Sequence, residues 1–367
     1  MKTACILLRN ENELLSNVEY AAIFDEFLKN GFPVSEIRML PERDDLPLKT
    51  SLKALQKEFP FVLVLTKKEL LLSVREALKT ALKTDKILQD GTGATVFPTE
   101  NGGVLLAYYG DEHALACVTG VCLPYLKNRS QTAFDRITLR AVGAKETLVK
   151  DLINQAAKLG DGKLRFVSFQ NYDETVVEIM YSDNASKRLV DGVVGTFVEE
   201  LSESLYAVDD TPLEKQLVEL LKIRGKKISV AESFTGGGIA KRISSVSGAS
   251  SVYFEGVNTY DETSKMKRLG VQALTLNTLG AVSDKTAYEM AAGLLDSGDC
   301  DVAISTTGIA GPNSDRTGAP VGLSFIGIGT KEKVYVYRYV FSGNRKEICE
   351  KAINYALFLA YKHLKKE

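Results

Sequence analysis

The sequence predicts an α/β protein with several domains. Short apolar runs that resemble buried strands alternate with amphipathic helical segments along most of the chain, an order typical of mainly parallel sheets with helices on both faces. The length of 367 residues allows two or three domains with separate cores. An apolar content of 45% and a charged content of 25% are those of an ordinary globular chain.

Residues 1–134 form the first predicted domain, of α/β type. We expect strands at Ala4–Leu8, Phe61–Leu65, Gly103–Tyr108 and His113–Thr119, and helices at Tyr20–Asn30 and Leu70–Leu82. The strand that ends at Leu65 is followed by Thr66-Lys67-Lys68-Glu69, which contains no glycine for a phosphate-binding loop. The isolated triplet Gly91-Thr92-Gly93 is interpreted as a turn.

Residues 135–208 form a second predicted domain, small and of α+β type. The expected elements are strands at Arg136–Val142, Lys163–Phe169 and Glu174–Tyr181, and helices at Lys145–Lys158 and Ser186–Leu205. This β-α-β-β-α order is KH-like, but the segment carries no basic stripe. A structural connector is therefore favoured over a nucleic-acid-binding module.

Residues 209–367 form the third predicted domain, again α/β. Its first helix should run through Leu221, with Thr211 as N-cap and Pro212 at the first helical position. Further expected strands are Lys227–Ala231, Val252–Tyr260, Val302–Ser305, Gly322–Gly329 and Lys333–Phe341. Further expected helices begin at Ile239 and cover Asp261–Leu269, Ser283–Leu295 (with Ser283 as cap) and Arg345–Leu364.

Charge and hydropathy exclude several classes of partner. Lys plus Arg number 46 and Asp plus Glu number 47, so no overall field favours nucleic acid or membrane. No apolar run approaches the length of a bilayer span, and Ala4–Leu8 is too short for a signal peptide. We expect a cytoplasmic protein with neither a membrane nor a nucleic acid as its partner.

Residues 230–240 combine a strand end, two hydroxyl side chains and three successive glycines. A strand that turns sharply into a helix presents free backbone N–H groups, and Gly236 and Gly237 would let a substrate approach them. Ser233 could be a nucleophile with these N–H groups as its oxyanion hole. Alternatively, Ser233 or Thr235 merely caps the helix, which is the interpretation that this stretch alone favours.

The scarcity of histidine and the scatter of cysteine narrow the possible chemistry. The only histidines, His113 and His363, lie far from Ser233 in the sequence, so a hydrolase would use Lys, Tyr or a carboxylate as its base. The five cysteines form no CxxC pair, so we expect neither a structural zinc site nor a disulfide framework. We also expect no cofactor.

Two later segments of the third domain offer further candidate site residues. Tyr260 and Lys265 follow a strand and could together serve as a base, unless Tyr260 packs in the core and Lys265 is solvated. Thr307 and Gly308 open a long loop that could serve a site or simply connect two strands. Arg345, at the start of the last helix, could hold a phosphate or carboxylate.

Five motifs together resemble the C-terminal domain of the CinA (competence/damage-inducible) family over about residues 210–365. They are AESFTGG, YDETSK, GAVS, TGIAGP followed by PVG, and GNR, in this order. The resemblance implies a nicotinamide-nucleotide amidohydrolase (NMN deamidase), which converts nicotinamide mononucleotide (NMN) to nicotinate mononucleotide and ammonia in pyridine nucleotide salvage. It also implies residue roles: Ser233 as nucleophile, Lys265 and Tyr260 as its activating groups, and Thr235, Gly236, Gly237, Thr307, Gly308 and Arg345 as substrate-binding residues.

The sequence departs from the family pattern at several positions near these motifs. Phe234 stands where the family has a small residue, Asp261 where it usually has Ser, and Ala319 where it commonly has Lys. Arg316, in the centre of the loop, could replace the missing cation. These changes leave the proposed chemical group intact and bear on substrate affinity and specificity.

The front of the chain resembles an eroded form of the family's molybdopterin-binding-like domain, whose members can hydrolyse ADP-ribose. The resemblance rests on Glu13-Leu14-Leu15 with Asn17, whereas Lys67-Lys68-Glu69 and Tyr109-Gly110-Asp111-Glu112 replace the two expected loops. We expect this domain to have lost pyrophosphatase activity and to serve folding or dimerisation, with a homodimer implied by the family. The alternatives are a catalytically silent nucleotide-binding or scaffold protein and a retained ADP-ribose pyrophosphatase.

Overall fold

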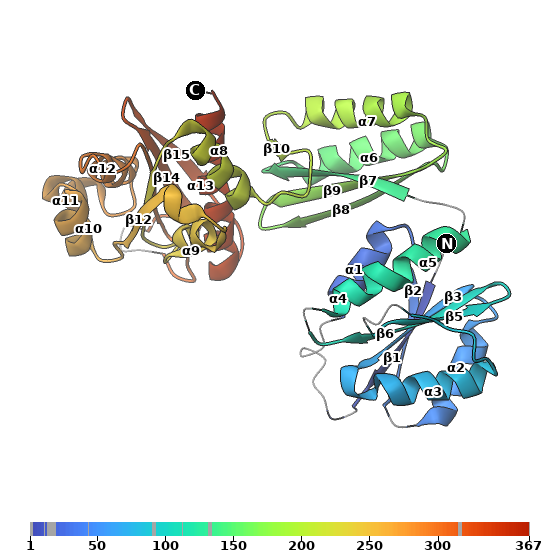
Figure 1. The fold of residues 1–367 in the computed structure, drawn as a ribbon. Coiled ribbons are helices and arrows are strands. Elements are labelled where there is room, and N and C mark those ends of the chain that lie inside the picture. The colour runs from blue at the N-terminus through green and yellow to red at the C-terminus, as the bar shows by residue number, and fades with distance from the viewer. Residues whose placement is uncertain are drawn as a thin grey trace. The chain divides into compact units, whose positions relative to one another are not determined.

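The structure is a computed structural model that describes residues 3–10, 12, 20–42, 44–89, 93–111, 113–130, 134–314 and 318–366. These residues build three sheets with helices packed against them (Figure 1). The predicted α/β class with more than one domain is therefore confirmed. Contacts divide the chain into two compact units, Met1–Ile137 with Ala156–Val167 and Glu178–Gly192, and Thr138–Gln155 with Ser168–Val177 and Val193–Glu367. The domain limits near residues 134 and 208 stay predictions.

The first sheet has six strands in the order β2-β1-β3-β6-β5-β4. The strands are β1 (Thr3–Arg9), β2 (Val34–Pro41), β3 (Phe61–Lys67), β4 (Leu88–Gln89), β5 (Thr95–Thr99) and β6 (Gly102–Tyr109). Strands β2, β1, β3 and β6 run parallel, and β5 and β4 are added antiparallel. This mostly parallel sheet agrees with the alternation of strands and helices in the sequence.

Helices cover both faces of the first sheet (Figure 1). They are α1 (Ala21–Lys29), α2 (Asp45–Leu55), a 3₁₀ turn η2 (Lys68–Leu70), α3 (Leu71–Leu82), α4 (Ala114–Cys117), a π-helical turn η3 (Val118–Cys122) and α5 (Leu123–Ser130). Successive residues of β1 point to opposite faces. Accordingly Cys5 packs with α1 and α4, and Ile6 packs with α2 and α3.

The strand predicted at His113–Thr119 is wrong, because this segment is helical. Its buried residues Ala114, Cys117 and Val118 recur at the spacing of one helix face. Strand β2 and helix α2 were not predicted from the sequence. Glu13, Leu14, Leu15 and Asn17, on which the resemblance of the front domain rests, lie outside the described residues, as do Glu112 and most of the triplet 91–93.

The second sheet has the order β10-β7-β9-β8. Its strands are β7 (Phe134–Val142), β8 (Leu164–Asn171), β9 (Glu174–Ser182) and β10 (Leu205–Ala207), and its helices are α6 (Glu146–Gly160) and α7 (Lys187–Glu200). The predicted β-α-β-β-α order is confirmed. The predicted helix Ser186–Leu205 is too long, because α7 ends at Glu200 and Leu205 begins a strand antiparallel to β7.

The third sheet has five strands in the order β12-β11-β13-β14-β15. They are β11 (Ile228–Glu232), β12 (Tyr253–Asn258), β13 (Val302–Gly308), β14 (Leu323–Thr330) and β15 (Val334–Val340). Strands β12, β11 and β13 run parallel, whereas β14 and β15 follow antiparallel. The carboxyl ends of the three parallel strands therefore lie at the same edge, where α/β proteins place their sites.

Two layers of helices enclose the third sheet. The helices are α8 (Leu213–Arg224), α9 (Gly238–Ser245), a 3₁₀ turn η4 (Ala249–Ser251), α10 (Glu262–Leu269), α11 (Ala273–Leu279), α12 (Asp284–Leu295) and α13 (Arg345–Lys366). Helices α8, α9 and α13 pack on one face, and α10, α11 and α12 on the other. Ser283 caps α12 as predicted, whereas Pro212, not Thr211, is the N-cap of α8. No helix in the described part of the chain is both long and apolar enough to cross a membrane.

Gly293 sets the distance between α12 and α10. A Cβ atom at this position would lie 2.0 Å from the carbonyl oxygen of Leu269, a backbone atom that cannot rotate away. We expect Gly293→Ala to lower the free energy of unfolding by about 1–3 kcal/mol, the usual cost of overpacking. Urea unfolding followed by circular dichroism would measure this loss.

A matched helical glycine provides the control for Gly293. A Cβ atom at Gly195 in α7 would meet nothing within 4 Å. Gly195→Ala should leave stability unchanged or raise it by up to about 1 kcal/mol, because alanine favours the helix. Equal stability of Gly293→Ala and Gly195→Ala would contradict the close approach of α12 to α10.

Candidate active site

Ser233, Thr259 and Thr307 come together at the carboxyl edge of the third sheet. Ser233 follows β11, Thr259 follows β12, and Thr307 is the second-last residue of β13. A pocket of about 240 Å³ opens at this edge, and its lining includes Ser233, Tyr260, Lys265, Thr307, Gly308 and Arg345. The structure thus brings six of the nine predicted site residues to one pocket.

Lys265 is buried and contacts Ser233 directly. Its side chain is only 1% exposed, although Lys265 lies in the short helix α10, which packs against the outside of the third sheet. Its Nζ atom lies 2.9 Å from Ser233 Oγ, 2.6 Å from the carbonyl oxygen of Thr259 and 3.2 Å from that of Tyr260. The alternative of a solvated Lys265 is therefore wrong.

The surroundings of Lys265 favour its neutral form. Burial lowers the pKa of the amine from 10.5 to about 8, against the opposing effect of Glu262 and Asp261. A neutral amine has two N–H donors and one lone pair, and the two carbonyl oxygens can only accept. In the neutral form the N–H groups would donate to the carbonyls of Thr259 and Tyr260, and the lone pair would face the Ser233 hydroxyl. This is the geometry of a general base on a nucleophile.

The start of α10 fixes the position of Lys265. Asp261 is the N-cap, and its Oδ1 accepts a hydrogen bond from the Thr263 amide at 2.8 Å. Lys265 and Leu269, four residues apart, are the buried residues of this helix. The departure of Asp261 from the family pattern is thus a helix cap, and this hydrogen bond lowers the pKa of its carboxyl group.

Glu232, which was not among the predicted site residues, organises the turn that follows β11. Its buried carboxylate accepts hydrogen bonds from the amides of Gly237 (3.1 Å), Ile239 (3.1 Å) and Ala240 (2.8 Å). The carboxylate therefore occupies the N-terminus of α9, where a negative charge is favoured. Ser233 is consequently not the cap of this helix. An acid directly before the glycine-rich turn was the signal that could have revealed this role.

The glycine turn leaves few free donors. The amide of Gly236 bonds to the Ser233 carbonyl, and the amide of Gly238 bonds to the Thr235 carbonyl, both at 3.1 Å. Thr235 Oγ1 lies 2.8 Å from Thr306 Oγ1. Thr235, Gly236 and Gly237 are not part of the pocket lining formed by described residues. Their role in binding substrate stays a prediction.

The amides of Phe234 and Thr235 find no acceptor among the described residues. They directly follow the candidate nucleophile, the position from which backbone amides stabilise an oxyanion in other hydrolases. The Phe234 ring packs with Ala310, Phe341 and α13, and would be 2.9 Å from a Cβ atom at Gly308. Gly308 therefore makes room for the large residue that follows Ser233.

The side chains of Tyr260 and Arg345 pair with each other at the pocket mouth. Arg345 donates from Nη2 to the Tyr260 hydroxyl at 3.0 Å and from Nη1 to the Gly311 carbonyl at 2.8 Å. The Tyr260 side chain is 62% exposed, and its hydroxyl forms no hydrogen bond with Ser233 or Lys265. Its carbonyl oxygen is what contacts Lys265. That the Tyr260 phenol helps to activate Ser233 stays a prediction.

Thr307 lies inside the pocket, and the loop beyond it is only partly described. Its hydroxyl donates to the Ala281 carbonyl at 2.5 Å, so its lone pairs remain available to a ligand. Arg316, the proposed replacement cation, lies outside the described residues. Ala319 accepts a hydrogen bond from Ser314 at its carbonyl oxygen. The described residues contain no cluster of three or more His, Cys, Asp or Glu side chains that could hold a metal ion.

Comparison with known proteins finds relatives along most of the chain. A family model described as the CinA C-terminal domain matches residues 210–364. A CinA-like protein of Kosmotoga olearia is 32% identical over 364 residues, which cover 91% of this chain and 85% of that protein. A CinA-like protein of Endomicrobium trichonymphae is 37% identical over 250 residues, or 66% of this chain.

These matches differ in how much of each relative they include. The chain spans 58% of the length of the Endomicrobium trichonymphae protein and of a relative from Caldicellulosiruptor saccharolyticus. The crystal structure of the competence damage-inducible protein A from Klebsiella pneumoniae matches 42% of this chain and 95% of that chain. Its sequence identity is 31% and its TM-score is 0.41.

The lowered pKa of Lys265 links the stability of the fold to pH. The unfolded chain releases this proton near pH 10.5 and the folded chain near pH 8. Between these values the unfolded state binds more protons, so this group makes the free energy of unfolding rise with pH. Urea unfolding from pH 7 to 10 should show a steeper rise for the wild type than for Lys265→Met. Identical slopes would contradict the lowered pKa.

The three hydrogen bonds to Glu232 should contribute measurably to stability. In Glu232→Gln, one acceptor oxygen is replaced by an NH₂ group that faces backbone donors. We expect the free energy of unfolding to fall by about 2 kcal/mol, the range for hydrogen bonds to charged groups. The exposed Glu255 on β12 gives the control, since Glu255→Gln should change stability by less than about 0.5 kcal/mol. Equal losses in urea unfolding would refute the capping role.

Proposed function

This chain belongs to the CinA family, and from that premise we propose that residues 209–367 hydrolyse the carboxamide of NMN to nicotinate mononucleotide and ammonia. The observation that carries the proposal is the 2.9 Å contact between Lys265 Nζ and Ser233 Oγ in a buried setting. The five sequence motifs suggest the substrate. Hydrolysis of this amide would place the protein in pyridine nucleotide salvage.

The first step is attack by Ser233 on the carboxamide carbon. The neutral Lys265 amine accepts the hydroxyl proton as the C–O bond forms, which makes the serine a competent nucleophile near neutral pH. The carbonyl oxygen of the substrate becomes an oxyanion in the tetrahedral intermediate. The free amides of Phe234 and Thr235 are the donors that could stabilise it.

The second step is the departure of ammonia. The Lys265 ammonium now donates to three acceptors and can return its proton to the leaving nitrogen as the C–N bond breaks. Water then attacks the acyl group on Ser233, and Lys265 again accepts a proton. The free acid leaves and the hydroxyl is restored, so that one water is consumed for each ammonia released.

The size and the charge of the site suggest how a mononucleotide would bind. The pocket of about 240 Å³ is smaller than the roughly 300–1,000 Å³ typical of sites that enclose a whole ligand. The nicotinamide ring would enter it, and the phosphate would remain at the mouth. Arg345 lies there with a guanidinium suited to a phosphate. The helix start at Gly237 is not available for this purpose, because Glu232 occupies it.

The turnover of NMN tests this proposal. Purified protein should release ammonia from NMN, and Ser233→Ala should reduce kcat by about 10⁴-fold or more. Lys265→Met should reduce it by about 10²–10⁴-fold, the usual contribution of a general base. The rate should rise with pH through about 8 as the amine becomes neutral.

A control lysine, one binding measurement and a second activity assay complete the experiment. Lys285, about half exposed on α12, gives the control, and Lys285→Met should keep wild-type turnover. Equal turnover by wild type, Ser233→Ala and Lys265→Met would refute the assignment. NMN binding by calorimetry without turnover would select a catalytically silent binding protein. Metal-dependent AMP release from ADP-ribose that survives Ser233→Ala would select a pyrophosphatase. The homodimer implied by the family also stays a prediction.

A further inference from the structure

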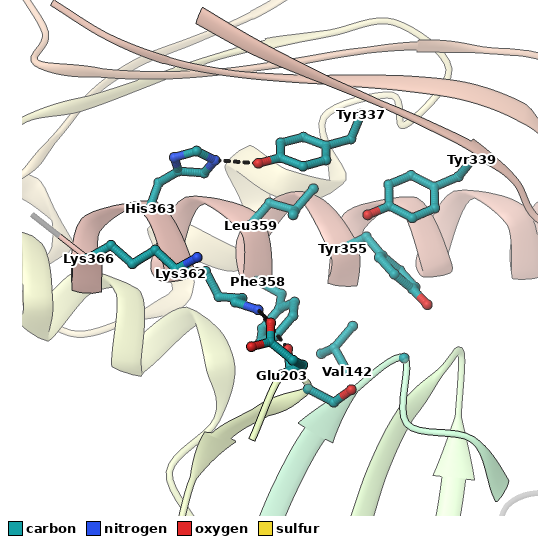
Figure 2. Close-up of a pocket in the computed structure, with 12 residues that line it drawn as sticks. Val142, Glu203, Tyr337, Tyr339, Tyr355, Phe358, Leu359, Lys362, His363 and Lys366 are labelled. Carbon is teal, nitrogen blue, oxygen red and sulfur yellow. Dashed lines mark hydrogen bonds and ion pairs between the residues drawn. The ribbon is translucent and has the colours of Figure 1, made fainter. Parts of the chain in front are cut away.

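A second pocket, of about 370 Å³, lies beside helix α13 (Figure 2). Strand β15 and the side of α13 from Tyr355 to Lys366 form most of its wall. The last residue of β7, the residue after it and the two residues directly before β10 complete it. None of its lining residues belongs to the Ser233 pocket. Its volume falls in the range of roughly 300–1,000 Å³ found for small-molecule sites.

Aromatic side chains make up much of this wall. The rings of Tyr339 and Tyr355 lie 4.7 Å apart between centroids, and Phe358 lies on the same helix as Tyr355. Figure 2 shows Tyr337 and Tyr339 extending from β15 towards α13, with the hydroxyl of Tyr337 bonded to His363 at 2.6 Å. Surfaces of this kind bind planar rings by stacking and edge contacts.

Two phenol groups in this wall remain available as hydrogen-bond donors. Among the described residues, the hydroxyls of Tyr339 and Tyr355 have no hydrogen-bond partner, although both side chains are half-buried. Burial raises the pKa of Tyr339 to about 12, so its phenol keeps the proton at neutral pH. A ligand that meets these groups must therefore carry acceptor oxygens.

Positive charge collects at one end of the second pocket. Lys362 Nζ donates to the Glu203 carbonyl at 2.8 Å and to its carboxylate at 2.7 Å, which leaves the third ammonium donor for a ligand. Lys366 lines the same end and forms no ion pair among the described residues. Among the described residues that line the pocket, Glu203 is the only acidic one, so this end carries a net positive charge.

We propose that this pocket binds a small aromatic anion of mononucleotide size. The ring would lie against Tyr339, Tyr355 and Phe358. The anionic group would accept hydrogen bonds from Lys362 and Lys366, and the two phenols would donate to oxygens between these ends. A purely apolar ligand would leave the phenols and the ammonium groups buried without acceptors, which is costly. A neutral ring would leave the positive end uncompensated.

Calorimetry with AMP tests this site in the full chain. AMP carries both the ring and the anion, whereas adenosine and ribose 5-phosphate each carry only one of them. We expect AMP to bind at least about tenfold more tightly than either fragment. Tyr339→Phe with Tyr355→Phe should weaken AMP binding by about tenfold, because two neutral hydrogen bonds are lost. Lys362→Met should weaken it by a similar factor.

Tyr335 provides the matched control. It lies on β15, on the same face as Tyr337 and Tyr339, but outside the second pocket. Tyr335→Phe should bind AMP like the wild type. Weaker binding by the Tyr339, Tyr355 and Lys362 variants separates this site from the proposed catalytic one, because none of these residues lines the Ser233 pocket. The proposal is overturned if AMP does not bind, if all variants bind it equally, or if adenosine binds as well as AMP. It is also overturned if sedimentation shows a dimer whose formation blocks AMP and depends on Tyr339 and Tyr355.

Discussion

The structure depends most on the burial of one amine. Lys265 is 1% exposed, and removal of an ammonium from water is unfavourable unless acceptors replace the water. Two carbonyls and one serine hydroxyl do so, but they do not cancel the penalty, and the pKa of Lys265 falls. This destabilisation of the ammonium form is what allows catalysis, because a lysine that stays protonated at neutral pH could not accept a proton from Ser233. The cap at Asp261 and the close packing at Gly293 hold α10 where this occurs.

Because of Glu232, the glycine-rich turn at this site differs from the phosphate-binding loops that it resembles in sequence. In such loops the N-terminal amides of a helix are left for the anion of a ligand. Here a carboxylate of the protein already takes the amides of Gly237, Ile239 and Ala240. The turn therefore serves to fix Ser233 at the end of β11. The phosphate of a substrate must find another cation, and Arg345 at the pocket mouth is the available one.

Most strands of the third sheet, and the residues of the candidate site, could be predicted from the sequence. Strand ends that carry Ser233, Tyr260 and Thr307 had to meet at one edge once the parallel order was inferred. Side-chain direction could not be inferred in the same way. Nothing local shows that the Tyr260 ring turns to Arg345 while its carbonyl turns to Lys265. The strand predicted at residues 113–119 was wrong for a related reason. A short apolar run fits both a strand and a helix until the pattern of its buried residues is known.

Helix α13 joins the two pockets physically. It is one continuous helix of 22 residues that begins with Arg345 at the catalytic pocket and reaches Lys366 at the second. Between them Asn354 is 3% exposed, bonds to Arg242 of α9, and donates to the Tyr172 carbonyl at 2.8 Å. These contacts hold the middle of α13, so one packed helix positions both Arg345 at the catalytic pocket and Lys366 at the second.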